Sequence, residues 1–172
     1  MALTLIKEDG TGRADANSYA SVADGNAYHD GHLYATAWTG AGDDQKAAAL
    51  VMASRLIDAE YQFNGLRSQS AQALQWPRRQ CRIQDLEEEL PENAVPAAVV
   101  QATCEMAREL LIADRTAAPA GEGLKYLNVA DNQTGYDKTD RRPVISQVAQ
   151  ALLGKYGSLL KSKSGAVRLV RG

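Results

Sequence analysis

The sequence has no long hydrophobic run, and this absence bears on where the protein works. None of its uncharged stretches approaches the roughly 18 apolar residues that mark a membrane-spanning helix. Its first residues lack the basic-then-apolar pattern of a secretory signal. We therefore expect a protein that is made in the cytoplasm and has no membrane partner.

Cysteine and histidine are scarce as well. Cys81 and Cys104 are far apart in the sequence, so we expect reduced, buried side chains instead of a disulfide framework. His29 and His32 are the two histidines. A His-x-x-His pair can bind zinc, but no paired cysteine spacing supplies the remaining ligands. We expect a solvated or hydrogen-bonded histidine pair, no metal site and no cofactor.

The motifs of several enzyme classes are also missing. The chain contains no Gly-x-Ser-x-Gly nucleophile elbow and no Walker lysine. The pair Gly10-x-Gly12 lacks the third glycine of a dinucleotide fingerprint. The acidic run Glu87–Glu89 is typical of a solvated face, because hard-cation loops alternate acids with turn residues. We expect no enzymatic activity; the alternative is an enzyme whose acids meet only in the folded chain.

Charge is distributed unevenly along the chain. Residues 1–136 carry 11 Lys/Arg against 19 Asp/Glu, a net charge of −8. Residues 137–172 carry 8 Lys/Arg against 2 Asp/Glu, a net charge of +6. An acidic body with a basic end indicates different partners for the two parts, although a basic end that only improves solubility is the simpler alternative.

The central stretch of the chain predicts a long amphipathic helix over residues 43–60. Asp43 and Asp44 suit its N-cap and first turn, where acids complement the helix dipole. Apolar and small residues recur at spacings of three and four along one face: Ala47, Leu50, Val51, Ser54, Ile57 and Tyr61. The dipeptide Asn64-Gly65 then predicts a turn.

An aromatic-rich elbow follows this helix. Its apolar residues lie close together in the sequence: Tyr61, Phe63, Leu66, Leu74 and Trp76. Pro77 biases Trp76 away from helical geometry. We expect the elbow to fold back and bury its aromatic side chains against the helix.

Other elements are predicted on both sides of this stretch. Ser21 and Asp24 resemble a capping box for a helix over residues 22–31, with Ala23, Ala27 and Tyr28 facing inward. Trp38 is expected to anchor a connecting loop.

Two more helices and a hairpin are predicted in the second half. A helix over residues 96–113 starts with Pro96 in its first turn and has Glu105, Arg108 and Glu109 facing solvent. A strand or hairpin is predicted over residues 124–136. The last helix, over residues 143–154, starts at Pro143 and is expected to bury Val144, Val148 and Leu152.

Together these elements predict a mainly α fold: a small helical bundle built on two long amphipathic helices, with a minor β element and an extended C-terminal tail. The expected organisation is an N-terminal arm over residues 1–20, a helical domain over residues 21–157 with a linker over residues 114–123, and a tail over residues 158–172.

A set of motif residues between positions 17 and 112 resembles a known family. The motif runs through Asn17-Ser18-Tyr19, Tyr28, the elbow and Val95-Pro96, and its core is Tyr19, Tyr28, Tyr61, Phe63, Gly65, Arg67, Leu74, Trp76, Pro77 and Arg78. This pattern resembles the head-to-tail connector (adaptor) proteins of tailed bacteriophages, a group also known as DnaT-like single-stranded-DNA-binding proteins.

The resemblance implies a structural virion protein at the head-to-tail interface. It implies an α-helical subunit without enzymatic activity that forms a homo-oligomeric ring of about twelve copies under the portal. The implied partners are the portal protein and a neck or tail completion protein, with passing contact to packaged double-stranded DNA. We expect the C-terminal tail to dock on the portal through Lys161, Lys163, Val167, Arg168, Leu169, Val170 and Arg171.

The alternative is a single-stranded-DNA-binding protein of phage replication. Aromatic residues of the elbow lie among Arg67, Arg78, Arg79 and Arg82, and stacking combined with phosphate contact is how such proteins hold a strand. Against it, Tyr61 and Trp76 fall on or beside the apolar stripe, and the acidic body opposes binding to phosphates.

Overall fold

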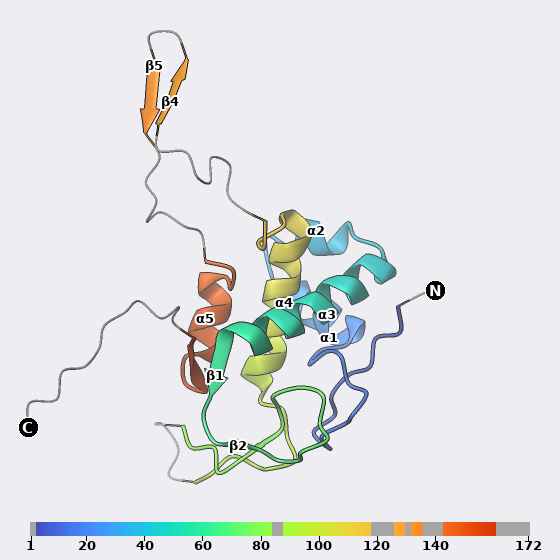
Figure 1. The fold of residues 1–172 in the computed structure, drawn as a ribbon. Helices are drawn as coiled ribbons and strands as arrows, with labels where there is room; N and C mark the ends of the chain where they lie inside the picture. The colour runs from blue at the N-terminus through green and yellow to red at the C-terminus, as the bar shows by residue number, and fades with distance from the viewer. Residues whose placement is uncertain (1–2, 84–87, 118–125, 130–131, 136–142, 161–172) are drawn as a thin grey trace, which may run out of the picture.

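The fold is mainly α-helical, as the sequence predicts (Figure 1). A computed structural model describes residues 3–83, 88–117, 126–129, 132–135 and 143–160. The helices are α1 (Val22–Asp30), α2 (Thr36–Thr39), α3 (Asp43–Glu60), α4 (Ala97–Ile112) and α5 (Gln147–Leu153). The strands are β1 (Tyr61–Phe63), β2 (Leu66–Arg67), β3 (Arg78–Arg79), β4 (Tyr126–Val129), β5 (Asn132–Gly135) and β6 (Gly157–Leu159).

Helices α3 and α4 cross at the centre of the molecule, and the other helices pack around them (Figure 1). The predicted apolar stripe of α3 is confirmed, since Ala47, Leu50, Val51, Ser54 and Ile57 are all buried. The N-cap of α3 is Gly42, so the predicted N-cap at Asp43 is wrong: Asp43 and Asp44 both lie in the first turn. Likewise, Pro96 is the N-cap of α4 and precedes its first turn.

Helix α1 starts with the capping box that the sequence predicts. The Ser21 hydroxyl accepts from the Asp24 amide at 3.1 Å, and the Asp24 carboxylate accepts from the Ser21 amide at 2.7 Å. The predicted inward face is wrong in part, because Ala23 and Ala27 are exposed while Gly25 and His29 are buried.

Trp38 is the reason for this rotation of α1. It lies in α2, not in a loop, and a Cβ atom at Gly25 would come within 2.3 Å of its ring. Only glycine at position 25 lets the indole pack directly on the helix backbone. The Trp38 indole N–H also donates to Asn26 Oδ1 at 3.0 Å.

The predicted N-terminal arm over residues 1–20 is part of the body. Tyr19 and Ala20 are fully buried in the core, and Lys7 forms a parallel bridge with Ser18. The buried Glu8 carboxylate accepts from the backbone amides of Gly10, Gly12 and Arg13, each at 2.9 Å. These bonds satisfy the loop internally, so the segment is not a free arm.

Helix α5 is shorter and differently oriented than predicted. It begins after the N-cap Ser146, not at Pro143, and it buries Ala149 and Leu153; Ile145, just before the helix, is buried as well. Val148 is exposed and Leu152 is only partly buried, so the predicted apolar face is off by one residue.

Three two-stranded antiparallel sheets complete the described fold: β1 with β6, β2 with β3, and β4 with β5. The predicted hairpin is confirmed as β4–β5, which stands away from the helices (Figure 1). Because Ser158 and Leu159 pair with Gln62 and Tyr61, the predicted tail boundary at residue 158 is wrong, and residues 157–159 belong to the body. The rest of the predicted tail, residues 161–172, lies outside the described residues. Within the described parts of the chain, no helix has the length and apolar character to cross a membrane.

Candidate functional surfaces

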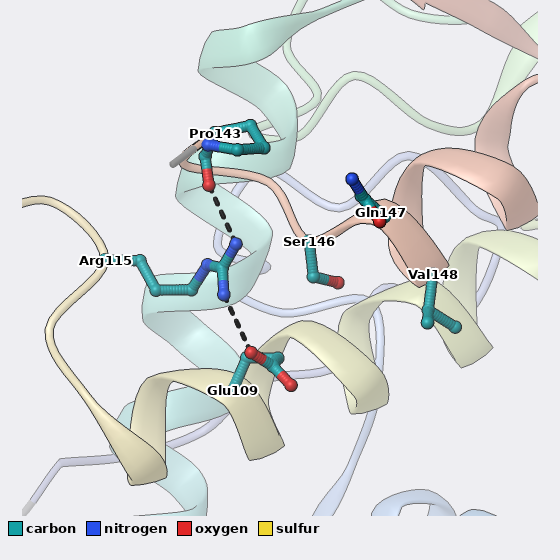
Figure 2. Close-up of a pocket in the computed structure, with 6 residues that line it drawn as sticks. All are labelled: Glu109, Arg115, Pro143, Ser146, Gln147 and Val148. Carbon is teal, nitrogen blue, oxygen red and sulfur yellow. Dashed lines mark hydrogen bonds and ion pairs between the residues drawn. The ribbon is translucent and has the colours of Figure 1, made fainter. Parts of the chain in front are cut away.

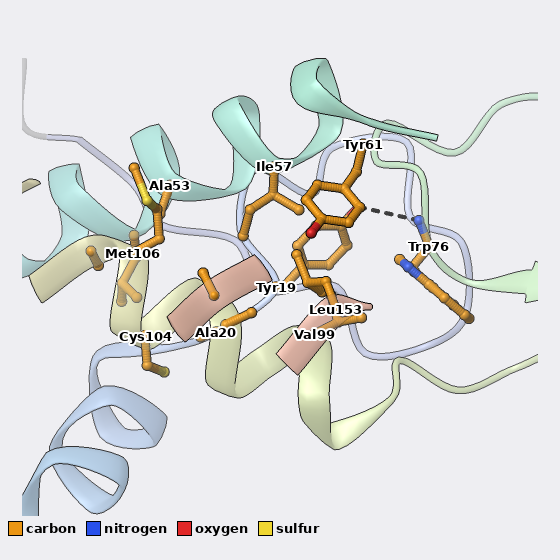
Figure 3. Close-up of a cluster of buried hydrophobic side chains, with 14 of the residues drawn as sticks. Tyr19, Ala20, Ala53, Ile57, Tyr61, Trp76, Val99, Cys104, Met106 and Leu153 are labelled. Carbon is orange, nitrogen blue, oxygen red and sulfur yellow. Dashed lines mark hydrogen bonds between the residues drawn. The ribbon is translucent and has the colours of Figure 1, made fainter. Parts of the chain in front are cut away.

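The aromatic residues of the elbow form a buried cluster beside α3 and α5 (Figure 3). Tyr61 and Phe63 stack with ring centroids 5.7 Å apart, and Phe63 meets Trp76 edge-on at 5.6 Å. The Trp76 side chain is fully buried, while Leu66 is 53% exposed, contrary to its expected place in the cluster. The three aromatic side chains are therefore part of the core and offer no stacking face to a nucleic acid.

A buried hydrogen-bond network fixes the elbow to the N-terminal segment. The Tyr19 hydroxyl donates to Asp58 Oδ1 at 2.5 Å and accepts from the Gln75 amide at 3.0 Å. It also accepts from the Trp76 amide at 3.2 Å (Figure 3). The Gln75 amide also donates to Asp58 Oδ2 at 3.0 Å. The sequence assigns no role to Asp58, because one aspartate on a helix gives no sign of a distant tyrosine.

Burial dominates the electrostatics of this network. It raises the pKa of Asp58 to about 6, although the Tyr19 hydrogen bond and the positive charges of Arg67 and Arg78 oppose the shift. Burial, with the nearby Asp58 charge, holds the pKa of the Tyr19 hydroxyl well above its ordinary value. The pair therefore ties two segments together, and its tyrosine stays protonated at neutral pH.

Arg78 holds the elbow together through hydrogen bonds to its backbone. Its guanidinium group is buried and donates to the carbonyl oxygens of Asn64 and Gly65, both at 2.7 Å, and to that of Phe63 at 3.3 Å. Gly65 has φ of +72°, and a Cβ atom there would lie 2.5 Å from the Arg79 carbonyl oxygen. Arg78 and Gly65 thus have structural roles, and Arg78 is not available to bind phosphate.

The remaining motif residues divide between the elbow and a second location. Leu74 and Pro77 are buried at the elbow, and the Trp76–Pro77 peptide bond is cis. Arg67 is exposed and donates to the Gln72 carbonyl oxygen. Tyr28 lies apart from the elbow on α1, half-buried, with its ring 4.9 Å from that of His29.

Three arginines of the elbow region reach solvent. Arg67 and Arg79 lie on the β2–β3 ladder, and the Arg82 side chain is 72% exposed. Arg82 pairs with Glu89 at 3.2 Å. These exposed arginines are the part of the described motif region that can contact a phosphate backbone.

A cluster of charges lies along the second half of α4, where the sequence analysis expected a solvated face. That expectation is wrong: Glu105 is 1% exposed and accepts from Arg108 at 2.6 Å. Arg108 also donates to Glu109 at 2.7 Å, and Glu109 accepts from Arg115 at 2.7 Å. Hydrogen bonds to Glu105 and Glu109 raise the pKa of Arg108. Mutual pairing is what allows these charges to be buried.

A pocket of about 340 Å³ lies beside this cluster, between the end of α4 and the start of α5 (Figure 2). Its lining residues are Glu109, Arg115, Pro143, Ser146, Gln147 and Val148. Arg115 donates to the carbonyl oxygens of Pro143 and Val144, both at 2.8 Å. The arginine thus joins the two ends of the excursion that carries the β4–β5 hairpin.

The histidine pair is partly buried. His29 Nε2 lies 3.2 Å from the Cys104 carbonyl oxygen, and burial lowers the pKa of His29. His32 Nε2 lies 3.9 Å from Glu105 Oε2. In the part of the chain that the structure describes, no group of three or more His, Cys, Asp or Glu side chains could hold a metal ion. Cys81 and Cys104 are both free and buried.

The residues that the sequence analysis assigned to portal binding, Lys161, Lys163, Val167, Arg168, Leu169, Val170 and Arg171, lie outside the described residues. Their role stays a prediction.

Comparison with known proteins identifies one family. Its model, described as "Putative DnaT-like ssDNA binding protein", matches residues 3–172. No curated protein and no solved structure matches the chain significantly.

Proposed function

The chain belongs to the DnaT-like ssDNA binding protein family over nearly its whole length, and we propose that it works where viral DNA passes between the phage head and tail. The protein is a structural virion subunit, a head-to-tail connector that forms a ring under the portal and joins it to the neck or tail. This proposal extends the resemblance of its motif residues to phage connector proteins.

One observation favours a structural function over single-stranded-DNA binding. The motif residues that suggested a DNA-stacking platform, Tyr61, Phe63 and Trp76, are all buried in the core. Single-stranded-DNA-binding proteins need aromatic faces that bases can reach. A motif that specifies a rigid scaffold instead suits a subunit whose task is to hold a defined position in an assembly.

The charge distribution also supports a connector. The net charge of −8 over residues 1–136 repels DNA from most of the body, which suits a channel that DNA passes without binding. The basic end of the chain can bind an acidic surface on the portal, and a ring presents many such ends at once.

The experiment for this proposal mixes purified portal rings with the protein. The comparison is a truncated chain that lacks the basic C-terminal residues 161–172. It ends at Leu160 because β6 belongs to the body, so its helical content and melting temperature should match those of the full chain. We expect the full chain to form rings on the portal in electron micrographs and the truncated chain to lose at least tenfold in portal affinity. Wild-type affinity of the truncated chain would assign docking to the helical body. Absence of any complex with the full chain would contradict the connector function.

The second candidate, ssDNA binding, is the function that the family description names directly. The exposed arginines Arg67, Arg79 and Arg82 favour it, since phosphate contacts supply most of the affinity in non-specific binding. Its test is a titration with fluorescent single-stranded DNA at about 0.15 M salt. Submicromolar binding that is lost when all three arginines become glutamine would establish this candidate.

The same DNA titration with the Trp76→Ala variant distinguishes the two candidate functions, because it tests whether the aromatic cluster is core or a DNA-stacking face. Removing a fully buried tryptophan should cost roughly 3–5 kcal/mol of stability and lower the soluble yield. The matched control is Leu66→Ala, at a half-exposed elbow position, which should be nearly neutral. A Trp76→Ala protein of normal stability that loses only DNA affinity would show that the indole is a stacking face.

A further inference from the structure

We propose that the β4–β5 hairpin of one copy pairs with the open edge of strand β6 on a second copy. This inference rests on the proposed function for its setting, because it names the contact between neighbouring copies in the ring. Four features of the described chain support it.

The first feature is an open edge on β6. In this antiparallel pair, Asn64 N–H donates to the Tyr156 carbonyl at 2.8 Å and Leu160 N–H donates to the Glu60 carbonyl at 2.7 Å. Since bonded residues alternate along such a ladder, the backbone groups of Gly157 and Leu159 point away from β1. Neither residue forms another backbone hydrogen bond to the described part of the chain. Among the described residues, strand β6 therefore has backbone donors and acceptors without a partner.

The second feature is that the opposite edge of the same sheet is closed. On β1, the Tyr61 N–H donates to the Ile57 carbonyl, and the Phe63 carbonyl accepts from Arg78 at 3.3 Å. Arg78 continues along this edge to the carbonyls of Asn64 and Gly65. A buried side chain thus occupies the β1 edge, and β6 is the side on which a further strand can be added.

The third feature is that the β4–β5 hairpin has no third strand beside it in the described ranges. Strands β4 and β5 pair with each other, and neither pairs with a third strand in the described ranges. The hairpin lies away from the helices (Figure 1). An isolated two-stranded hairpin is marginally stable in water and needs a third strand or a packed helix. Arg115 holds the base from which the hairpin extends, by donating to the carbonyl oxygens of Val144 and of Pro143 (the latter in Figure 2).

The fourth feature indicates that the segment which pairs with the β6 edge is the hairpin. Exposed edge strands usually carry charged residues or proline, which prevent pairing with other chains. The sequences of β4 (Tyr-Leu-Asn-Val), β5 (Asn-Gln-Thr-Gly) and β6 (Gly-Ser-Leu) contain neither. Strands of four and three residues also match in length. The C-terminal residues, which include Arg168 and Arg171, have the charges that oppose edge pairing.

The first experiment measures self-association by analytical ultracentrifugation. In the test variant, a flexible Gly/Ser segment of equal length replaces residues 126–135. We expect the full chain to form oligomers and the variant to stay monomeric with an unchanged melting temperature. A chain ending at Leu160 is the matched control and should associate like the full chain. Unchanged association of the hairpin variant, loss of association in the control, or a full chain that stays monomeric would each overturn the inference.

The second experiment locates the contact by disulfide trapping. A protein with Ser158→Cys, at an exposed position of β6, is mixed with one carrying Asn128→Cys in β4 under mild oxidation. We expect a cross-linked dimer of the two variants, and no such dimer when Thr116→Cys, outside the hairpin, replaces Asn128→Cys. If rings form on the portal but this cross-link fails, the connector function stands and the hairpin contact is wrong.

Discussion

At the scale of single residues, buried charges close loops and connect segments of the chain. Glu8 closes the N-terminal loop through three amides, and Arg78 closes the elbow through four backbone carbonyls. Asp58 connects α3 to Tyr19 and to the elbow. A buried charge is costly unless hydrogen bonds replace its water. These bonds give each of the three residues a structural function that its sequence position does not reveal.

Asp58 makes stability depend on pH in a direction that is unusual for an aspartate. Its pKa is about 6 in the folded chain, above the ordinary 3.8, so folding favours the protonated form. The cost of the buried carboxylate is therefore present above about pH 6 and disappears as the pH falls toward 4. A difference of about two pKa units corresponds to at most about 3 kcal/mol.

The measurement is urea unfolding of the wild type and Asp58→Asn between pH 4 and pH 7. The asparagine variant lacks this titration, so the wild type should gain stability relative to it as the pH is lowered. A difference between the two proteins that stays constant over this range would show that burial does not shift the Asp58 carboxyl.

Arg78 offers a second test at the residue scale. Arg78→Lys keeps the charge, but a single ammonium group cannot reach the same four carbonyl oxygens in the geometry of a guanidinium. We expect a loss of roughly 1–3 kcal/mol in the free energy of unfolding. Arg79→Lys is the matched control at the exposed neighbouring position and should change little. Equal effects of the two substitutions would contradict the bonding role of Arg78.

At the scale of elements, α4 combines an apolar half with a charged half. Its first part buries Val99, Ala102 and Thr103, and the later part buries Glu105 beside Arg108. His32 Nε2 from the α1 region lies 3.9 Å from the same carboxylate. Burial, with the charge of this carboxylate, raises the pKa of Tyr28. The charged cluster therefore joins α1, α4 and the Arg115 contact at the base of the hairpin excursion.

Removal of Glu105 should weaken this junction of elements. Glu105→Ala leaves a cavity and removes one of the two carboxylate partners of Arg108, so we expect a cost of about 3 kcal/mol. Glu92→Ala is the control at an exposed position. Chemical denaturation measures both variants, and hydrogen exchange should show faster exchange near the α1–α4 contact in the first. A neutral Glu105→Ala variant would show that the cluster does not stabilise the fold.

At the scale of the whole molecule, the segregation of charge governs interactions with DNA. The last twelve residues, 161–172, contain Lys161, Lys163, Arg168 and Arg171 and no acid, so a chain ending at Leu160 has a net charge of −6 instead of −2. The chain is cut after β6 because α5 and β6 contribute to the core.

We expect weak DNA binding that depends steeply on salt and resides in this basic end. Loss of four cations should lower the slope of log affinity against log salt by up to about 3 for single-stranded DNA. Fluorescence anisotropy at several salt concentrations measures the slope for both chains. Submicromolar binding by the truncated chain at about 0.15 M salt would place the DNA site on the body.

The sequence by itself determined the elements whose signals are local. The stripe of α3, the capping box at Ser21, the β4–β5 hairpin and the burial of the elbow aromatics all follow from periodicity, capping chemistry or apolar clustering over short distances. The mainly α fold class follows from the same signals.

Tertiary structure alone decided the features that depend on distant partners. Helix α1 faces inward through Gly25 because Trp38 packs on it, and Glu105 is buried because Arg108 accompanies it. Residues 157–159 join the body because β1 lies beside them, nearly a hundred residues away in sequence. Periodicity cannot reveal such contacts, since the free energy of burying a glycine face, a carboxylate or a strand edge depends on the partner that folding brings to it.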